Sequence, residues 1–172
     1  MRAIVAAGGD AIGRGLFYDD ETLRAYMRKQ RDSVWCIDSG GRRKGSVDGY
    51  AVLLSLRPRT VEWIRSGDLV RGRDILDTDL EGSLEESDAM YVGMVHGEPR
   101  VAPTLVRHFV QLALDFDRRR RPQLVLARPG TSMGRLVMNR MGFGPFGEAP
   151  EIEATYTDRL AFIEEARRRG AC

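Results

Sequence analysis

The sequence predicts a mixed α/β fold with an antiparallel first half and a parallel strand–helix–strand step in the second half. In the first half, two β-type runs, residues 34–38 and 47–56, flank the glycine-rich segment "SGGRRKGS". Such a short connection favours neighbouring antiparallel strands. In the second half, the apolar run 90–95 precedes a long helical pattern and then "QLVLA" at 123–127. Strands joined by a packed helix are normally parallel with a right-handed crossover.

The other elements of the first half follow from apolar spacing and end signals. Residues 19–32, "DDETLRAYMRKQRD", predict a helix because acidic residues begin it and basic residues end it. A second, short helix is expected in "RPRTVEWIRSG", with Thr60 as its cap and a stop at Ser66 and Gly67. The acidic segment 77–88 then predicts an exposed connection whose charge would attract a cationic amine.

In the second half, helical spacing within 100–121 predicts the crossover helix. Another helix is expected from Thr131, whose hydroxyl can cap it, to Met141, with Gly142 ending it. Alternation in "EIEATYTDRL" predicts a half-exposed antiparallel strand before a charged tail. We expect the whole chain, 1–172, to form one domain.

Composition excludes several classes of protein. Apolar residues make up 42% and charged residues 30% of the chain, and no apolar run could span a bilayer, so we expect a cytoplasmic protein without a membrane partner. A net charge of +2 indicates no nucleic-acid partner, and the basic run 118–121 is interpreted as a solvated helix end. The two cysteines, Cys36 and Cys172, predict free thiols, with neither a disulfide nor a metal site.

The turn "VHGEPRVAPT", residues 95–104, is the first candidate for chemistry. It joins a strand to the start of a helix, where free backbone N–H groups attract anions. Arg100 offers a charged donor, and Val101, Ala102 and Thr104 can present N–H groups. The alternative is an ordinary strand-to-helix turn without a ligand.

The order "AMYVGMV", crossover helix, "QLVLA" and "GTSMGRLVMNRMGF" resembles the carboxyl-terminal half of the Gcn5-related N-acetyltransferase (GNAT) superfamily, over residues 89–143. The resemblance implies a GNAT-like fold in which the first of these strands carries a bulge and splays from the next. It also implies acetyl-CoA as cosubstrate, without a metal, with the pantetheine arm on the backbone of that strand and the pyrophosphate on the following turn. The residues assigned to the cosubstrate are Met94, Val95, Arg100, Val101, Ala102, Thr104 and Thr131.

The sequence departs from the family pattern on the late helix and at the phosphate turn. Thr131 stands where the family has Asn, and Gly134 where it has Ala. Met138 stands where a tyrosine commonly protonates the coenzyme thiolate, and a thioether has no proton to donate. The turn before the crossover helix lacks the family's glycine-rich repeat.

The resemblance implies an acyl-CoA-dependent N-acyltransferase in which an amine of a small molecule or peptide attacks the thioester directly. His96 and, through a water molecule, Glu98 are the candidate catalytic bases, although a histidine at a strand end can equally be structural. A second hypothesis is a catalytically inactive binding or regulatory module of the same fold. The acyl group, the acceptor and the formation of a homodimer are left open.

Overall fold

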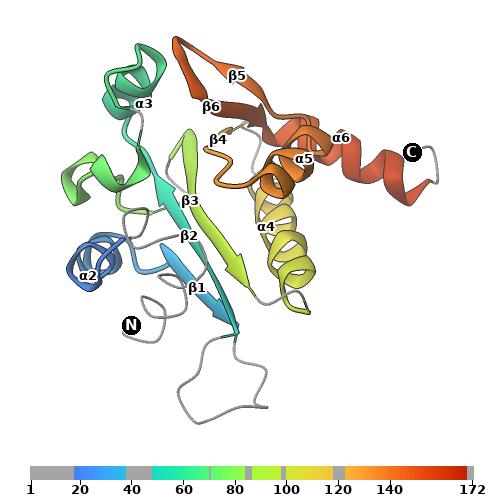
Figure 1. The fold of residues 1–172 in the computed structure, drawn as a ribbon, viewed down its shortest axis with the longest axis horizontal. Helices are drawn as coiled ribbons and strands as arrows, with labels where there is room; N and C mark the ends of the chain where they lie inside the picture. Colours follow the sequence, from blue (N-terminus) through green and yellow to red (C-terminus); the bar gives the residue numbers. More distant parts are fainter. Residues whose placement is uncertain are drawn as a thin grey trace.

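The computed structural model describes residues 18–37, 48–69, 71–83, 87–97, 100–117 and 123–169 (Figure 1). Glu98, Cys172 and the basic run 118–121 lie outside these ranges, so the predictions made for them stay predictions. The helices are α2 (Asp20–Lys29), α3 (Pro58–Arg65), the 3-10 turns η1 (Gly72–Asp74) and η2 (Asp77–Asp79), α4 (Ala102–Asp117), α5 (Ser132–Arg140) and α6 (Thr157–Arg168). The strands are β1 (Val34–Ile37), β2 (Gly49–Ser55), β3 (Ala89–Gly97), β4 (Leu124–Ala127), β5 (Gly144–Phe146) and β6 (Ala149–Tyr156).

The strands form one mixed sheet in the order β1-β2-β3-β4-β6-β5. β1 pairs with β2, and β2 with β3, in antiparallel fashion. β3 and β4 are parallel and are connected through α4, and β6 then pairs antiparallel with β4. The predicted fold class, an antiparallel first half followed by a parallel step, is therefore confirmed.

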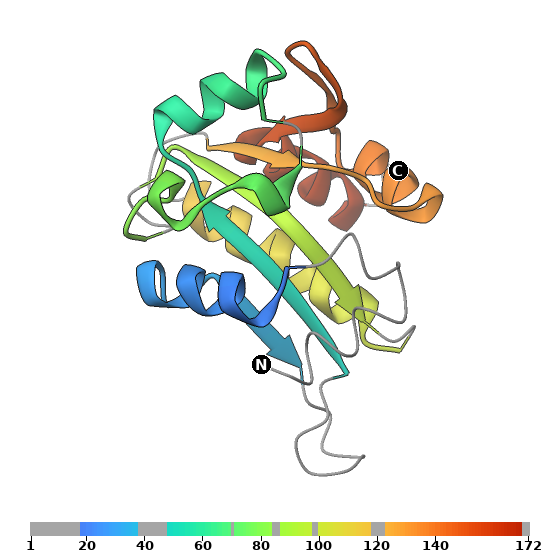
Figure 2. The same cartoon turned by 60° about the vertical axis from the view of Figure 1, so that its left-hand side comes forward.

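Two hydrophobic clusters cover the two faces of the sheet. The first cluster lies under α2, α3 and the 3-10 turns and contains Leu23, Ile64 and Leu80, together with Tyr91 of β3. The second lies under α4, α5 and α6 and contains Phe109 of α4, among others. Figure 2 shows α2 and α4 on opposite sides of the central strands. Strand β2 is buried along its whole length because it lies between both clusters.

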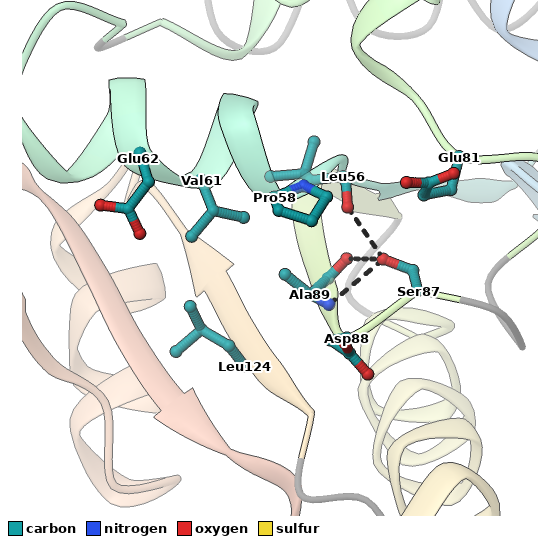
Figure 3. Close-up of a pocket in the computed structure, with 9 residues that line it drawn as sticks. All are labelled: Leu56, Pro58, Val61, Glu62, Glu81, Ser87, Asp88, Ala89 and Leu124. Carbon is teal, nitrogen blue, oxygen red and sulfur yellow. Dashed lines mark hydrogen bonds between the residues drawn. The ribbon is translucent and has the colours of Figure 1, made fainter.

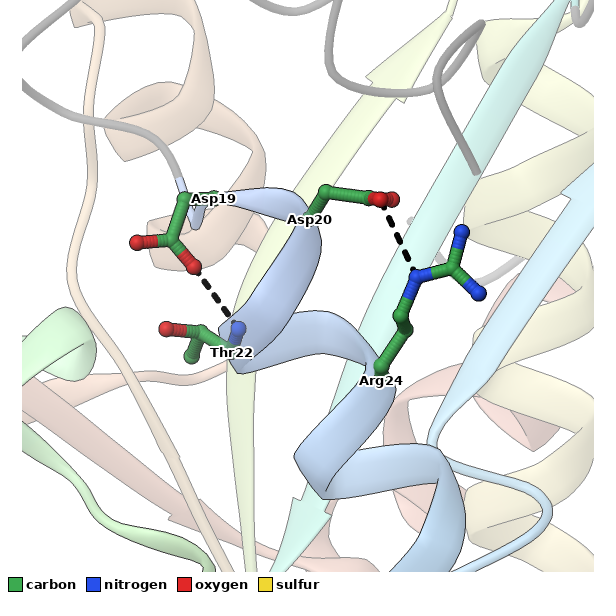
Figure 4. Close-up of polar contacts among 4 residues, drawn as sticks. All are labelled: Asp19, Asp20, Thr22 and Arg24. Carbon is green, nitrogen blue, oxygen red and sulfur yellow. Dashed lines mark hydrogen bonds and ion pairs between the residues drawn. The ribbon is translucent and has the colours of Figure 1, made fainter.

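Helix α2 is fixed at both ends. The Asp19 carboxylate accepts a hydrogen bond from the Thr22 N–H at 2.7 Å, and Arg24 forms an ion pair with Asp20 one turn along (Figure 4). At the other end, the buried Gln30 side chain accepts from the Ser55 N–H at 3.0 Å. The Gln30 contact holds α2 against β2, and the Asp19 cap fixes the first turn of the helix, which Tyr18 directly precedes.

Three local features differ from the sequence analysis. Thr60 does not cap α3, which begins two residues earlier at Pro58, because proline suits the first helical position and Thr60 instead donates to the Asp79 carbonyl. The charged tail forms α6, whose buried Leu160 packs in the second cluster. A short strand, β5, was not predicted. It pairs with β6 after the tight turn at Gly147, where φ is +64°.

Candidate functional site

The edge of β3 opens where β4 ends. The parallel pairing of β3 with β4 stops at Val92 and Ala127, whereas β3 continues to Gly97 and pairs there with β2. Among the described strands, β2 is thus the one partner of residues 93–97. This part of β3 keeps backbone groups on its other side that an extended ligand can pair with.

A β-bulge marks the start of this open edge. Val52 of β2 pairs with Met94 and Leu53 pairs with Val92, so Gly93 is the extra residue in β3. Bulges redirect a strand and are frequent beside binding sites. The bulge and the parting of β3 from β4 are the two backbone features that the resemblance implies for this strand.

The side chains of the open edge alternate between the two faces. Met94 packs against the first cluster and accepts a hydrogen bond from the Tyr50 hydroxyl at 3.0 Å. His96 lies opposite Tyr50, with ring centroids 5.6 Å apart, and is half-buried. Val95 points the other way and is 37% exposed. His96 is accessible enough to contact a ligand, but its described neighbour is an aromatic ring rather than a carboxylate that would orient it.

The predicted anion site at the start of α4 is already partly engaged. The Arg100 guanidinium lies 3.0 Å from the carboxylate of the buried Asp48. The Thr104 N–H donates to the Val101 carbonyl at 3.0 Å, which leaves it poorly placed for a second acceptor. Val101 is itself buried, and Ala102 begins the helix. Arg100 remains about half exposed, so its guanidinium can still reach a phosphate beside Asp48.

Helix α5 has the predicted ends. Thr131 caps it and accepts from the Gly134 N–H at 3.0 Å. Gly142 follows the helix with φ of +79°, and the Phe143 N–H returns to the Met138 carbonyl, as in a Schellman motif. The Met138 side chain packs against the second cluster. Met138 is half-buried there, and its thioether has no proton to donate.

The structure adds a polar cluster that the sequence did not indicate. The hydroxyl of Tyr18 lies against the bulge at Gly93, inside the space that a Cβ atom there would need. A Cβ on Gly72 would lie 2.6 Å from the Tyr18 hydroxyl and 2.9 Å from that of Tyr91. Two glycines thus provide the space for two tyrosine hydroxyls beside the open edge. We call Tyr18, Gly72, Tyr91 and Gly93 the tyrosine cluster.

Burial controls the ionisation of the tyrosine cluster. Burial raises the pKa of Tyr18 well above its usual value, and the nearby Tyr91 and Tyr26 raise it further. Burial also raises the pKa of Tyr91 to about 12, although Arg128 and the Gly72 backbone amide lower it in part. Both hydroxyls therefore keep their protons at neutral pH and are available as hydrogen-bond donors.

A pocket of about 240 Å³ lies at the opposite end of β3 from the open edge (Figure 3). Leu56, Val61 and Leu124 form its apolar part, and Glu62, Glu81 and Asp88 contribute acidic groups. It begins at Ala89, and a strand rises about 3.3 Å per residue, so it lies on the order of 13 Å or more from the bulge. Glu81 and Asp88, the residues of the acidic segment 77–88 that line this pocket, therefore do not lie beside the open edge.

Comparisons with known proteins leave the chain without an assigned family. No family model and no curated protein matches it. A chain in a solved structure described as "The crystal structure of KacTA-DNA complex" is similar over 88% of this chain and 89% of that chain, at 12% sequence identity and a TM-score of 0.47. A likeness of this degree carries no information about substrate or partner.

Two further kinds of feature are absent from the described residues. Over the described ranges, no group of three or more His, Cys, Asp or Glu side chains could hold a metal ion. Within the same part of the chain, no helix combines the length and apolar character needed to cross a membrane. Cys36 is a free thiol on the exposed side of β1.

Proposed function

We propose that the protein is an acyl-CoA-dependent N-acyltransferase, most simply one that transfers an acetyl group from acetyl-CoA to an amine. The observation that carries the proposal is the open edge of β3, where a bulge at Gly93 and the end of β4 at Ala127 leave residues 93–97 paired on one side. An unpaired strand edge suits an extended arm with amide groups, such as pantetheine. The resemblance of residues 89–143 to the GNAT superfamily supports the same ligand.

The start of α4 would hold the phosphates. Helix starts attract anions, and Arg100 lies two residues before this one. The residues assigned to the cosubstrate are Met94 and Val95 through their backbone, then Arg100, Val101, Ala102 and Thr104 of the turn, and Thr131 at the cap of α5. The acyl-CoA, when bound, supplies an activated carbonyl carbon, and the protein's main task is to hold an amine beside it.

Within this proposal, His96 is the described candidate for taking up the proton of the attacking amine. It lies on the open edge, two residues beyond Met94, and a neutral imidazole nitrogen can accept a proton. Glu98 would act there through a water molecule. An amine whose charge is removed by such a base can attack the thioester carbon.

Titration calorimetry with acetyl-CoA tests the proposal. We expect saturable binding, and Arg100→Gln should weaken it about tenfold or more because it removes a charge-assisted hydrogen bond to phosphate. Arg107→Gln, on an exposed position of α4, is the matched control and should bind as the wild type does. Absence of binding at millimolar acetyl-CoA would contradict the proposal, and equal losses in both variants would misplace the phosphate turn.

A second candidate function is a binding or regulatory module of the same fold without transfer activity. Two contacts favour it: Tyr18 occupies space beside the bulge, and Met138, half-buried against the second cluster, stands where a tyrosine acid would be expected. Mass spectrometry of the purified protein separates the two functions. Retained CoA or acetyl-CoA favours the enzyme, whereas a wild-type chain that binds neither favours the module.

A further inference from the structure

We propose that the Tyr18 hydroxyl donates a hydrogen bond to the sulfur atom that leaves during acyl transfer. This inference rests on the proposed function and names a residue, outside the stretch that resembles the GNAT superfamily, that acts on the reacting atoms. It is drawn from the tyrosine cluster at the open edge of β3. Tyr18 lies just before α2, far in the sequence from the open edge, so no spacing of residues indicates its role.

The hydroxyl of Tyr18 is placed where the open edge begins. It lies against Gly93, the extra residue of the bulge, and within 2.6 Å of the position that a Cβ on Gly72 would take. Any side chain at either glycine would displace it. A ligand that pairs with the backbone of residues 93–97 would therefore begin beside the bulge against which this hydroxyl lies.

Within the described residues, no group forms a hydrogen bond with the Tyr18 hydroxyl, and the residue is only 5% exposed. The other buried tyrosines nearby are satisfied within the described residues: Tyr26 donates to the Ile75 carbonyl at 2.5 Å, and Tyr50 donates to the Met94 sulfur at 3.0 Å. A buried hydroxyl without a partner costs about 1–3 kcal/mol. A chain that only needed a filler beside the bulge could use phenylalanine without that cost, so a hydroxyl here indicates a partner supplied by a ligand.

The Tyr18 hydroxyl can donate the hydrogen bond to sulfur that Met138 cannot donate. In the transfer step, the amine nitrogen bonds to the carbonyl carbon, the carbon–sulfur bond breaks, and the nitrogen gives its proton to His96 or solvent. The sulfur leaves as a thiolate, and the Tyr18 hydroxyl stabilises its negative charge by donating a hydrogen bond until water supplies a proton. Met138 faces the core on the other side of the sheet and cannot donate.

The ionisation state of Tyr18 suits this role. Burial keeps the phenol neutral beyond the pH at which a thiol begins to ionise, about 8.5 for an ordinary thiol. A donor that stays protonated while the sulfur becomes anionic gives a charge-assisted hydrogen bond, which is stronger than a neutral one. Tyr91 and Tyr26, the groups facing Tyr18, are also kept neutral by burial, so they do not compete as anions.

The test compares the affinities for CoA and for desulfo-CoA, which lacks the sulfur, by titration calorimetry at pH 7 and pH 9. Wild type should prefer CoA, and the preference should grow at pH 9 as the thiolate forms. Tyr18→Phe should lose about tenfold or more of that preference at pH 9 because it removes a hydrogen bond to a charged sulfur. Tyr156→Phe, an exposed position on β6, is the control and should keep the wild-type preference.

The outcomes separate this inference from the proposed function. If wild type binds CoA and Tyr18→Phe keeps the same preference over desulfo-CoA, the inference is overturned and the proposed function stands. If wild type binds neither CoA nor acetyl-CoA, both fail. Tyr18→Phe should melt at the wild-type temperature or above, since it removes an unpartnered hydroxyl. If that variant does not fold, the wild type alone decides, because a preference that does not change between pH 7 and pH 9 also overturns the inference.

Discussion

The Arg100 guanidinium lies 3.0 Å from the Asp48 carboxylate, which is almost fully buried at the start of β2. This pair joins the turn before α4 to the first residues of β2. The pair gives Arg100 a structural role in addition to its proposed role in binding phosphate.

Loss of Arg100 should therefore reduce stability. Arg100→Gln removes the cation that lies 3.0 Å from the buried Asp48 carboxylate, and we expect the free energy of unfolding to fall by about 1–3 kcal/mol. The control Arg107→Gln should stay within about 0.5 kcal/mol of wild type. Urea denaturation monitored by circular dichroism measures both, and equal stability of the two variants would contradict a structural role for the pair.

A Cβ atom at Gly93 should destabilise the fold through Tyr18. Gly93→Ala places a methyl group inside the space of the Tyr18 hydroxyl, and overpacking of this kind costs about 1–3 kcal/mol. In a Tyr18→Phe background the loss should be smaller, because the remaining nearest atom is the ring carbon at 3.1 Å. A double-mutant cycle measures the coupling, and strict additivity would mean that the hydroxyl does not lie at the bulge.

Stability should fall in alkaline solution. Burial raises the pKa values of Tyr50 and Tyr91 to about 12, whereas an unfolded tyrosine titrates near 10. A raised folded pKa means that the stability is fully present below about pH 10 and is lost as the pH rises from there toward 12. Urea denaturation across this range should show the decline, and the double variant Tyr50→Phe, Tyr91→Phe should show a shallower one. A profile that is flat from pH 8 to 12 would contradict this expectation.

Gly142 should resist substitution. Its φ of +79° disfavours other residues, and a Cβ there would lie 2.6 Å from Nε of Arg159 and 2.9 Å from Cδ1 of Ile163. We expect Gly142→Ala to lower the free energy of unfolding by about 1–3 kcal/mol. Gly130→Ala meets no atom within 4 Å and should change the thermal midpoint little. Similar midpoints for both variants would contradict the tight contact between α5 and α6.

The sequence predicted the sheet well because periodicity and helix ends are local signals. Thr131 and Gly142 bound α5 as expected, since capping and positive φ depend on neighbouring residues. Thr60 was wrong as a cap because Pro58 is a better first residue, and Thr60 found a partner, the Asp79 carbonyl, in a distant segment. The helix of α6 was missed because its few buried residues, such as Leu160, are visible only against α4.

The candidate site was less predictable because its contacts join residues that are far apart in the sequence. The open edge was expected from the order of elements, and the bulge follows that expectation. The Arg100–Asp48 pair joins residues 52 positions apart, and Tyr18 meets Gly93 from 75 positions away in the numbering. Neither pairing leaves a pattern in the sequence. The first depends on how the turn before α4 lies against the start of β2, and the second on how the segment before α2 packs on β3.

The anchoring of α2 has one more consequence. Tyr18 stands directly before the Asp19 cap, so fraying of the first helical turn would withdraw its hydroxyl from the bulge while the sheet stays folded. Hydrogen bonds from the backbone lower the pKa of Asp19, and the cap therefore weakens only as the pH falls below the usual aspartate range. Local opening of this one turn needs less free energy than global unfolding. Its equilibrium would set the fraction of molecules whose Tyr18 hydroxyl lies at the bulge and can donate to the sulfur.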